Sequence, residues 1–198
     1  LERGEIPPFS LEGTSTNGLN LPSNRPHDFE NRSKCSGIGM WAIVDQIWTA
    51  GLAGWIKSRT VLEIMAGAGW LAKALSDHGV RIVATDGYMS YKTVFPVKKM
   101  WAARAASEID ADILLVSWPP YTSKAIIKAC DRWGTRRPII YIGENSGGCN
   151  APEVFFKHFQ ETEQQPDIPL MSNLEMCAGQ REKSKEPILE QRSGKELF

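Results

Sequence analysis

The stretch Val61–Asp86, VLEIMAGAGWLAKALSDHGVRIVATD, decides the fold of this 198-residue chain. It begins with a short run of strand formers and turns through Ala66-Gly67-Ala68-Gly69. Apolar residues from Trp70 to Leu75 then fit one buried face of a helix, and a second β-rich run ends at Asp86. Strand, glycine turn, helix and strand form a βαβ unit, which predicts a parallel sheet with a right-handed crossover.

The turn and the acid that follows the second strand suit a nucleoside ligand. Glycines let a ligand approach the backbone, and the helix offers unpaired N–H groups at its start. Asp86 is placed to accept hydrogen bonds from both hydroxyls of a ribose. No Gly-Lys-Ser or Gly-Lys-Thr follows the glycines, which excludes the phosphate cradle of a nucleotide triphosphatase. Glu63, beside the turn, would repel a pyrophosphate and favours a cationic ligand such as S-adenosylmethionine.

The segment Glu63-Ile64-Met65-Ala66-Gly67-Ala68-Gly69 resembles the glycine-rich first motif of the class I S-adenosylmethionine-dependent methyltransferases. Asp86 falls where these enzymes have their ribose-binding acid, and the resemblance extends over residues 36–159. It implies a Rossmann-like, three-layer α/β/α sandwich with a mostly parallel sheet of about seven strands. Met65 departs from the motif, because it stands where the family most often has its first glycine. The cofactor-binding residues that the resemblance implies are Glu63, Met65, Ala66, Gly67, Gly69, Trp70, Asp86, Gly87, Ser117 and Trp118.

A second motif follows the continuously apolar run Asp112–Ser117, which is typical of a central parallel strand. The prolines of Ser117-Trp118-Pro119-Pro120-Tyr121 predict a rigid, extended turn after that strand. The turn resembles the Pro-Pro-Tyr motif of amino-group methyltransferases, in which an Asp, Asn or Ser before the prolines holds the target amine. Trp118 stands at that position here, and its side chain accepts no hydrogen bond. A main-chain carbonyl of Trp118 or Pro119 is therefore the expected acceptor, with Tyr121 beside it and Pro120 fixing the turn.

A further carboxylate, Glu144, follows the predicted strand 138–142. If the strand order is that of the family, Glu144 lies at the same edge of the sheet as Tyr121. It could there orient a nucleophile or take its proton. The candidate catalytic residues are therefore Trp118, Pro119, Pro120, Tyr121 and Glu144.

Composition limits the classes of function. The 23 basic and 23 acidic residues give a net charge of zero, which removes the strongest sign of a nucleic-acid-binding protein. The four cysteines are widely spaced and suggest neither a zinc site nor a disulfide framework. No apolar run reaches the length of a membrane span, and the start of the chain lacks a secretory pattern. These features predict a cytoplasmic protein without a metal site.

The two ends are less regular. Residues 1–34 predict an irregular arm, and residues 35–198 a single methyltransferase-like domain. Apolar residues at helical spacing predict an amphipathic helix over 38–56. The resemblance to the methyltransferases, in which the segment before the first motif often closes over the cofactor, implies Ser36, Gly37 and Met40 as candidate neighbours of the cofactor. A helix is expected over 151–160 and strands within 168–177 and 188–191, joined by a hairpin tip at 180–186.

The function favoured by these patterns is methyl transfer from S-adenosylmethionine to an N or O acceptor on a small molecule or protein. Three alternatives stay open. The first is methylation of a nucleic-acid amino group. The second is an NAD-binding oxidoreductase, because Gly67-Ala68-Gly69-Trp70-Leu71-Ala72 also satisfies GxGxxA. The third is a cofactor-binding module without catalytic activity.

Overall fold

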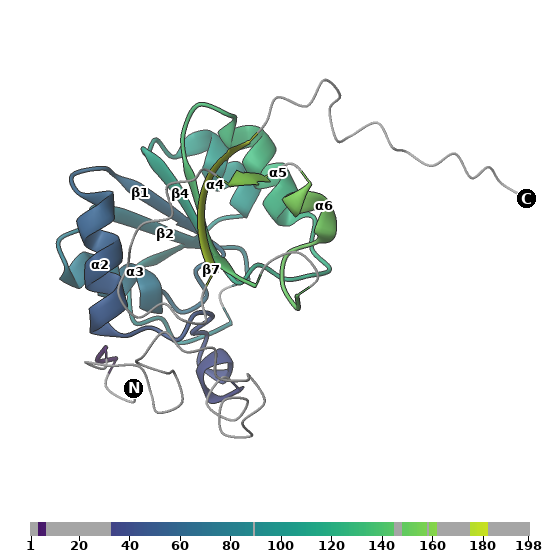
Figure 1. Ribbon diagram of the computed structural model, residues 1–198. Helices are drawn as coiled ribbons and strands as arrows, with labels where there is room; N and C mark the ends of the chain where they lie inside the picture. The colour runs from purple at the N-terminus through teal and green to yellow at the C-terminus, as the bar shows by residue number, and fades with distance from the viewer. Residues whose placement is uncertain are drawn as a thin grey trace, which may run out of the picture.

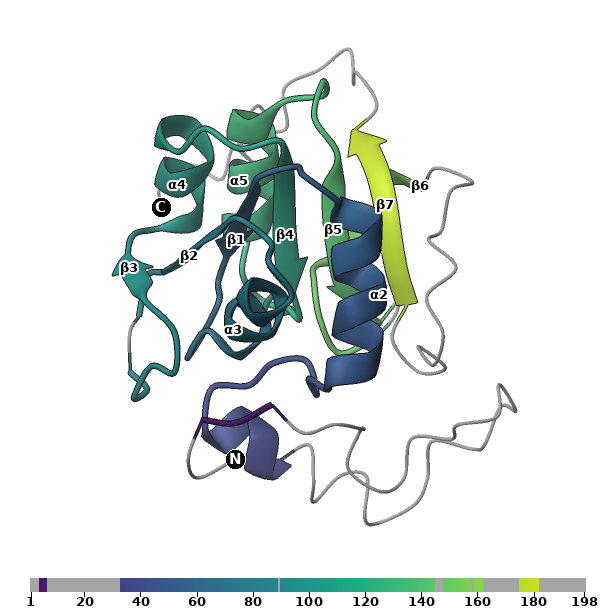
Figure 2. The same ribbon diagram turned by 90° about the vertical axis from the view of Figure 1, so that its left-hand side faces the viewer.

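A computed structural model describes residues 4–6, 33–88, 90–144, 148–157, 159–161 and 175–181. Its sheet has the strand order β3-β2-β1-β4-β5-β7-β6, which Figure 2 shows from one side. The strands are β1 Val61–Ile64, β2 Ile82–Asp86, β3 Val97–Lys99, β4 Ile113–Ser117, β5 Ile139–Gly143, β6 Phe159–Glu161 and β7 Glu175–Arg181. Strands β1 to β5 are parallel, and β7 lies antiparallel between β5 and β6. The predicted Rossmann-like, mostly parallel α/β fold is confirmed.

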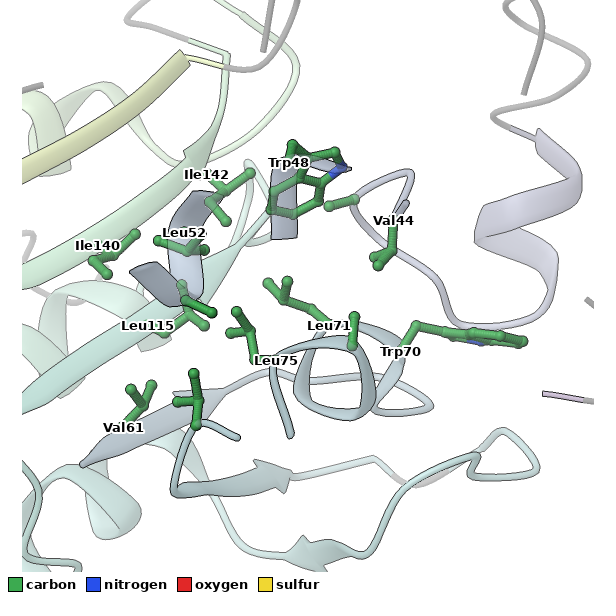
Figure 3. Close-up of a cluster of buried hydrophobic side chains, with 14 of the residues drawn as sticks. Val44, Trp48, Leu52, Val61, Trp70, Leu71, Leu75, Leu115, Ile140 and Ile142 are labelled. Carbon is green, nitrogen blue, oxygen red and sulfur yellow. The ribbon is translucent and has the colours of Figure 1, made fainter. Parts of the chain in front are cut away.

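Helices cover both faces of the sheet and complete the three layers (Figure 1). One face carries α2 Gln46–Ile56 and α3 Trp70–Asp77, and the other carries α4 Ala102–Glu108, α5 Ala125–Trp133 and α6 Glu153–Phe156. Successive strand residues point to opposite faces. Val61 therefore packs under α2 and α3, as Figure 3 shows, whereas Leu62 packs under α4 and α5. Burial on both faces explains why β1, β4 and β5 read as continuous apolar runs.

The helix predicted over 38–56 is shorter than expected. A helical turn spans 33–37, residues 38–45 form a loop, and α2 begins only at Gln46. Asp45 sets this start, because its carboxylate accepts hydrogen bonds from the N–H groups of Ile47 and Trp48 at 2.9 and 3.0 Å. The division into an arm at 1–34 and a domain at 35–198 stays a prediction, since most of residues 1–34 lie outside the described part.

The C-terminal prediction was wrong in its boundaries. The helix expected over 151–160 is limited to α6, and β6 already begins at Phe159. Gln180 and Arg181, expected in a hairpin tip, belong to β7. The strand expected at 188–191 lies outside the described residues. An edge strand as short as β6 has no sequence period long enough to detect, which explains the error.

Candidate functional site

The chain order of the strands places a crevice at the centre of the sheet. The chain runs outward from β1 through β2 to β3 and then returns to β4 on the other side of β1. In open α/β sheets, ligands bind outside the carboxyl ends of the strands where the order reverses in this way. The glycine turn of residues 65–69 follows β1, and Ser117 and Trp118 lie at the end of β4. The fold thus brings the two sequence motifs together at one edge.

The glycine turn requires a left-handed backbone at three places. Met65, Gly67 and Gly69 have φ values of 57°, 57° and 82°. Glycine adopts such values freely, whereas a side chain makes them unfavourable. Met65, which carries a side chain, therefore holds its place in the turn under backbone strain.

Asp86 connects the turn to the end of β2. Its buried carboxylate accepts hydrogen bonds from the N–H of Gly67 at 2.9 Å and from the N–H of Tyr88 at 2.8 Å. An ionised carboxylate has about four acceptor positions, so both oxygens can accept further bonds. The backbone of the turn and of Tyr88 thus fixes the position of this acid, and its role in ribose binding stays a prediction.

An exposed aromatic pair lies beside Asp86. A Cβ atom placed on Gly87 would overlap the Trp101 ring, so only glycine lets this indole come so close to the backbone. Trp101 is 58% exposed, and Tyr88 meets it edge-on with ring centroids 5.2 Å apart. The pair offers a planar surface next to the acid, in a position suited to a purine ring.

Glu63 is buried below the turn instead of facing the open crevice. It is 2% exposed, and the N–H of Ala72 in the first turn of α3 donates to its carboxyl group. The pKa of Glu63 is raised from 4.5 to about 8, mainly by burial and also by the charge of Asp86, although the bond from Ala72 acts in the opposite direction. Within the described part of the chain, Glu63 Oε2 has no hydrogen-bond partner. At neutral pH this group is largely a neutral acid.

A small cavity of about 10 Å³ adjoins Glu63, large enough for one water molecule. Ser117 lines it from β4, and the buried Ser117 Oγ is a second atom that has no partner among the described residues. The remaining walls come from the loop before α2, from the glycine turn and from α3. They are Gly39, Trp41, Ala42, Val44, Ala66, Trp70 and Leu71.

Gly39 and Trp41 were missed by sequence reasoning, which had suggested Ser36, Gly37 and Met40 as neighbours of the site. Gly37 has open space around it, and Met40 is buried in the hydrophobic core. A helical period was expected across this segment, and it hid the loop that turns Gly39 and Trp41 toward the glycines. The Gly-x-Trp spacing after a short helix carries no signal that could have revealed it.

The proline turn is also strained at its first residue. Trp118 has φ 47°, and its N–H donates to the carbonyl of Ile142 in β5 at 2.7 Å. The carbonyl of Pro119 accepts from the N–H of Ala151 at 2.8 Å, and Pro120 forms a bridge with Asn150. The ring of Tyr121 is 53% exposed. Strain in a turn at a strand end is common at ligand sites.

Asn150 is another residue that the sequence analysis did not select. It is buried, its Oδ1 accepts from the N–H of Glu144 at 3.0 Å, and its Nδ2 donates to the hydroxyl of Tyr141. The carboxylate of Glu144 in turn accepts from the N–H of Cys149. The loops after β4 and β5 are thus joined through Asn150, and Glu144 does lie at the same edge of the sheet as Tyr121.

The described residues contain no group of three or more His, Cys, Asp or Glu side chains arranged to hold a metal ion. Their helices also include none that is both long and apolar enough to cross a bilayer.

Comparisons with known proteins find likeness in structure only. No family model matches this sequence, and no curated protein does. Among solved structures, the 1,6-didemethyltoxoflavin-N1-methyltransferase of Burkholderia thailandensis has a TM-score of 0.46 at 15% identity, over 82% of this chain and 93% of that one. The N-methyltransferase NodS of Bradyrhizobium japonicum has a TM-score of 0.44 at 11% identity, over 80% and 89%. A ribosomal protein methylase of Lactobacillus delbrueckii subsp. bulgaricus has a TM-score of 0.44 at 14% identity, over 69% and 76%.

These neighbours are methyltransferases by name, and they act on different acceptors. Likeness at this level carries no information about what this chain binds. What this chain binds is therefore inferred from the residues of the site.

Proposed function

We propose that this chain is an S-adenosylmethionine-dependent methyltransferase of the class I type. One observation carries the proposal. Asp86, at the end of β2, is held against the glycine turn at the point where the strand order reverses. Directly below that turn lies Glu63, one of whose carboxyl oxygens has no hydrogen-bond partner among the described residues. Two acids on either side of a glycine turn suit a ligand that has ribose hydroxyls at one end and a positive charge at the other.

The residues of the site fit the parts of this cofactor. Asp86 would accept from the ribose hydroxyls, and the ring of Trp101 on Gly87 would lie against the adenine. Met65, Ala66, Gly67, Gly69 and Trp70 would surround the methionine part, with Glu63 near its ammonium group. The cofactor would supply an electrophilic methyl group, so the chain has mainly to bring an acceptor into line with it and to exclude water.

The alternative of a dinucleotide such as NAD is disfavoured by the backbone of the turn. Pyrophosphates bind to unpaired N–H groups at a glycine turn and at the start of the following helix. Here the N–H of Gly67 bonds to Asp86, that of Ala68 to Gly39 and that of Ala72 to Glu63. A pyrophosphate would have to displace two acids and would then lie beside them.

The acceptor would bind at the end of β4. Ser117, Trp118, Pro119, Pro120 and Tyr121 would line its side of the site, and Glu144 would orient it or take its proton. The Pro119 carbonyl already accepts from Ala151, but a carbonyl oxygen has a second lone pair for an acceptor amine. We favour a small molecule or protein as acceptor over nucleic acid, since the net charge is zero. The cytoplasmic location also stays a prediction.

Calorimetry with S-adenosylhomocysteine and with NADH tests this function. The purified chain should bind S-adenosylhomocysteine and not NADH. Asp86→Ala should weaken that binding about 100-fold, because a charged acceptor of two ribose bonds is lost. Asp77→Ala is the matched control, since Asp77 pairs with Lys73 on the exposed side of α3 and should have no effect. Binding of NADH alone would refute the proposal, and binding without methyl transfer to any acceptor pool would favour a non-catalytic module.

A further inference from the structure

The glycine turn is covered by the chain itself. Residues 38–44, here called the strap, cross it directly. The carbonyl of Gly39 accepts from the N–H of Ala68 at 3.0 Å, and the carbonyl of Ile38 accepts from the Trp70 indole at 3.3 Å. A Cβ atom on Gly67 would lie 2.5 Å from both the Gly39 oxygen and the Trp41 indole nitrogen. The space that Gly67 leaves open is therefore filled by the strap.

Tyr91 holds the strap from the outside. A Cβ atom on Gly39 would come within 2.7 Å of the Tyr91 ring, and Gly39 has a left-handed φ of 73°. The rings of Trp41 and Tyr91 meet edge-on, with centroids 5.7 Å apart. Gly67 in the turn and Gly39 in the strap both lack a side chain, so the strap and the turn approach each other more closely than side chains would allow.

The space below the strap contains buried polar atoms without hydrogen bonds among the described residues, which destabilises the closed form. They are Glu63 Oε2 and Ser117 Oγ. A ligand with donor groups would satisfy both of them. The cavity of about 10 Å³ admits at most one water molecule, and three of its lining residues, Val44, Trp70 and Leu71, are drawn in Figure 3. An amino-acid-sized group can reach Glu63 only if the strap moves.

We propose that the strap closes the cofactor site of the free protein, and that the cofactor enters by displacing the strap while its ammonium group replaces a proton on Glu63. This inference rests on the proposed function and adds two steps to cofactor binding, the displacement of the strap and the release of a proton from Glu63. The O–H bond of the Glu63 carboxyl group breaks, its proton passes to the solvent, and the resulting carboxylate pairs with the cation.

The charges around Glu63 support this exchange. Asp86, on β2, is the charged group that acts on it, α3 contributes the Ala72 N–H, and the other residues that line the cavity from the strap, the turn and β4 are uncharged. Asp45, next to the strap, is turned toward the first N–H groups of α2. Burial keeps the pKa of Glu63 at about 8 in the closed form, and a bound cation would lower it. Cofactor binding near pH 7 should therefore release a proton.

The proton is measured by calorimetry of S-adenosylhomocysteine binding to the full chain at pH 7, in two buffers with different ionisation enthalpies. We expect release of about one proton, and an affinity that rises about tenfold per pH unit from pH 6 to 7. Glu63→Gln, which keeps the shape of the side chain, should release none and should remove this pH dependence.

The gate is measured by stopped-flow tryptophan fluorescence. If opening of the strap limits entry, the observed rate should level off as the concentration of S-adenosylhomocysteine increases. Gly39→Ala should raise that plateau, because the new methyl group meets both the Tyr91 ring and the backbone nitrogen of Ala68 in the turn and so weakens the closed position of the strap. Gly37→Ala, two residues away and with open space around it, is the matched control and should behave like the unaltered chain.

The outcomes separate this inference from the function on which it rests. No binding of S-adenosylhomocysteine overturns both. Binding without proton release, or release that persists in Glu63→Gln, overturns the exchange while the proposed function stands. A rate that increases linearly with ligand concentration and does not differ between Gly39→Ala and Gly37→Ala overturns the gate. Circular dichroism of each variant checks that the chain is folded.

Discussion

The two halves of the crevice satisfy their polar groups in different ways. In the half at β1 and β2, Glu63 Oε2 is buried without a partner among the described residues, under a strap held to the turn by few polar contacts. In the half at β4 and β5, Asn150 bonds to Glu144 and Tyr141, and Pro119 and Ala151 join the two loops. The buried atoms that lack partners among the described residues, Glu63 Oε2 and Ser117 Oγ at the end of β4, thus lie at the small cavity below the strap, whereas the loops after β4 and β5 are bonded to each other.

This difference indicates which half changes when a ligand binds. Buried polar atoms without partners destabilise the closed form by about 1–3 kcal/mol each, and a ligand that satisfies them recovers that free energy. A network with its bonds already made has little to gain from rearrangement. We therefore expect the cofactor half to open and close and the acceptor half to serve as a rigid edge.

The largest expected effect concerns the stability of the first half. A buried acid whose pKa is raised stabilises the fold below its unfolded pKa and loses that contribution as the pH rises through the folded value. For Glu63 this window runs from 4.5 to about 8. The free energy of unfolding should fall across it by roughly 5 kcal/mol from this group alone.

Glu63→Gln removes the titrating group and should be more stable than the unaltered chain at pH 8, with a much smaller difference at pH 5. Urea unfolding followed by tryptophan fluorescence at both pH values measures this. Parallel pH profiles for the two proteins would show that Glu63 titrates normally, and the contrast between the halves would then lose its main support.

A medium effect is expected in the second half. Asn150→Ala removes the acceptor of the Glu144 N–H and one hydrogen bond to the Tyr141 hydroxyl, which should lower the free energy of unfolding by about 2 kcal/mol. Thermal unfolding should show a decrease in Tm of roughly 4–8 °C. The affinity for S-adenosylhomocysteine should stay unchanged, and a large loss of affinity would contradict the separation of the two halves.

The smallest effect concerns the exposed aromatic rings. Trp101→Ala removes the planar surface beside Asp86 and should weaken S-adenosylhomocysteine binding by up to about tenfold, since an aromatic pair contributes about 0.5–1.5 kcal/mol beyond area burial. Tyr121→Ala removes a similarly exposed ring from the other half and should leave that affinity unchanged. Equal losses in both variants, measured by calorimetry, would place the cofactor across both halves.

Local patterns predicted the strands and turns around the site, whereas the roles of its residues stay predictions. The spacing within one βαβ unit placed Asp86 at the end of a strand next to β1, and the bond from the Gly67 N–H to its carboxylate is a finding of the structure. The placement of Tyr121 and Glu144 at one edge of the sheet follows once β4 and β5 are parallel neighbours. The spacing could not reveal the positive φ of Trp118, because tryptophan is not a residue type associated with that conformation.

The sequence by itself determined the parallel core, the glycine turn and the acid that faces it, because strand and helix periods and turn residues act over a few positions. Only the tertiary structure decided that Gly39 and Trp41 cover the turn, that Glu63 is buried as a neutral acid, and that β7 lies between β5 and β6. Each of these depends on contacts between segments far apart in the chain. Burial and strand order are properties of the assembled layers, and no short stretch of residues encodes them.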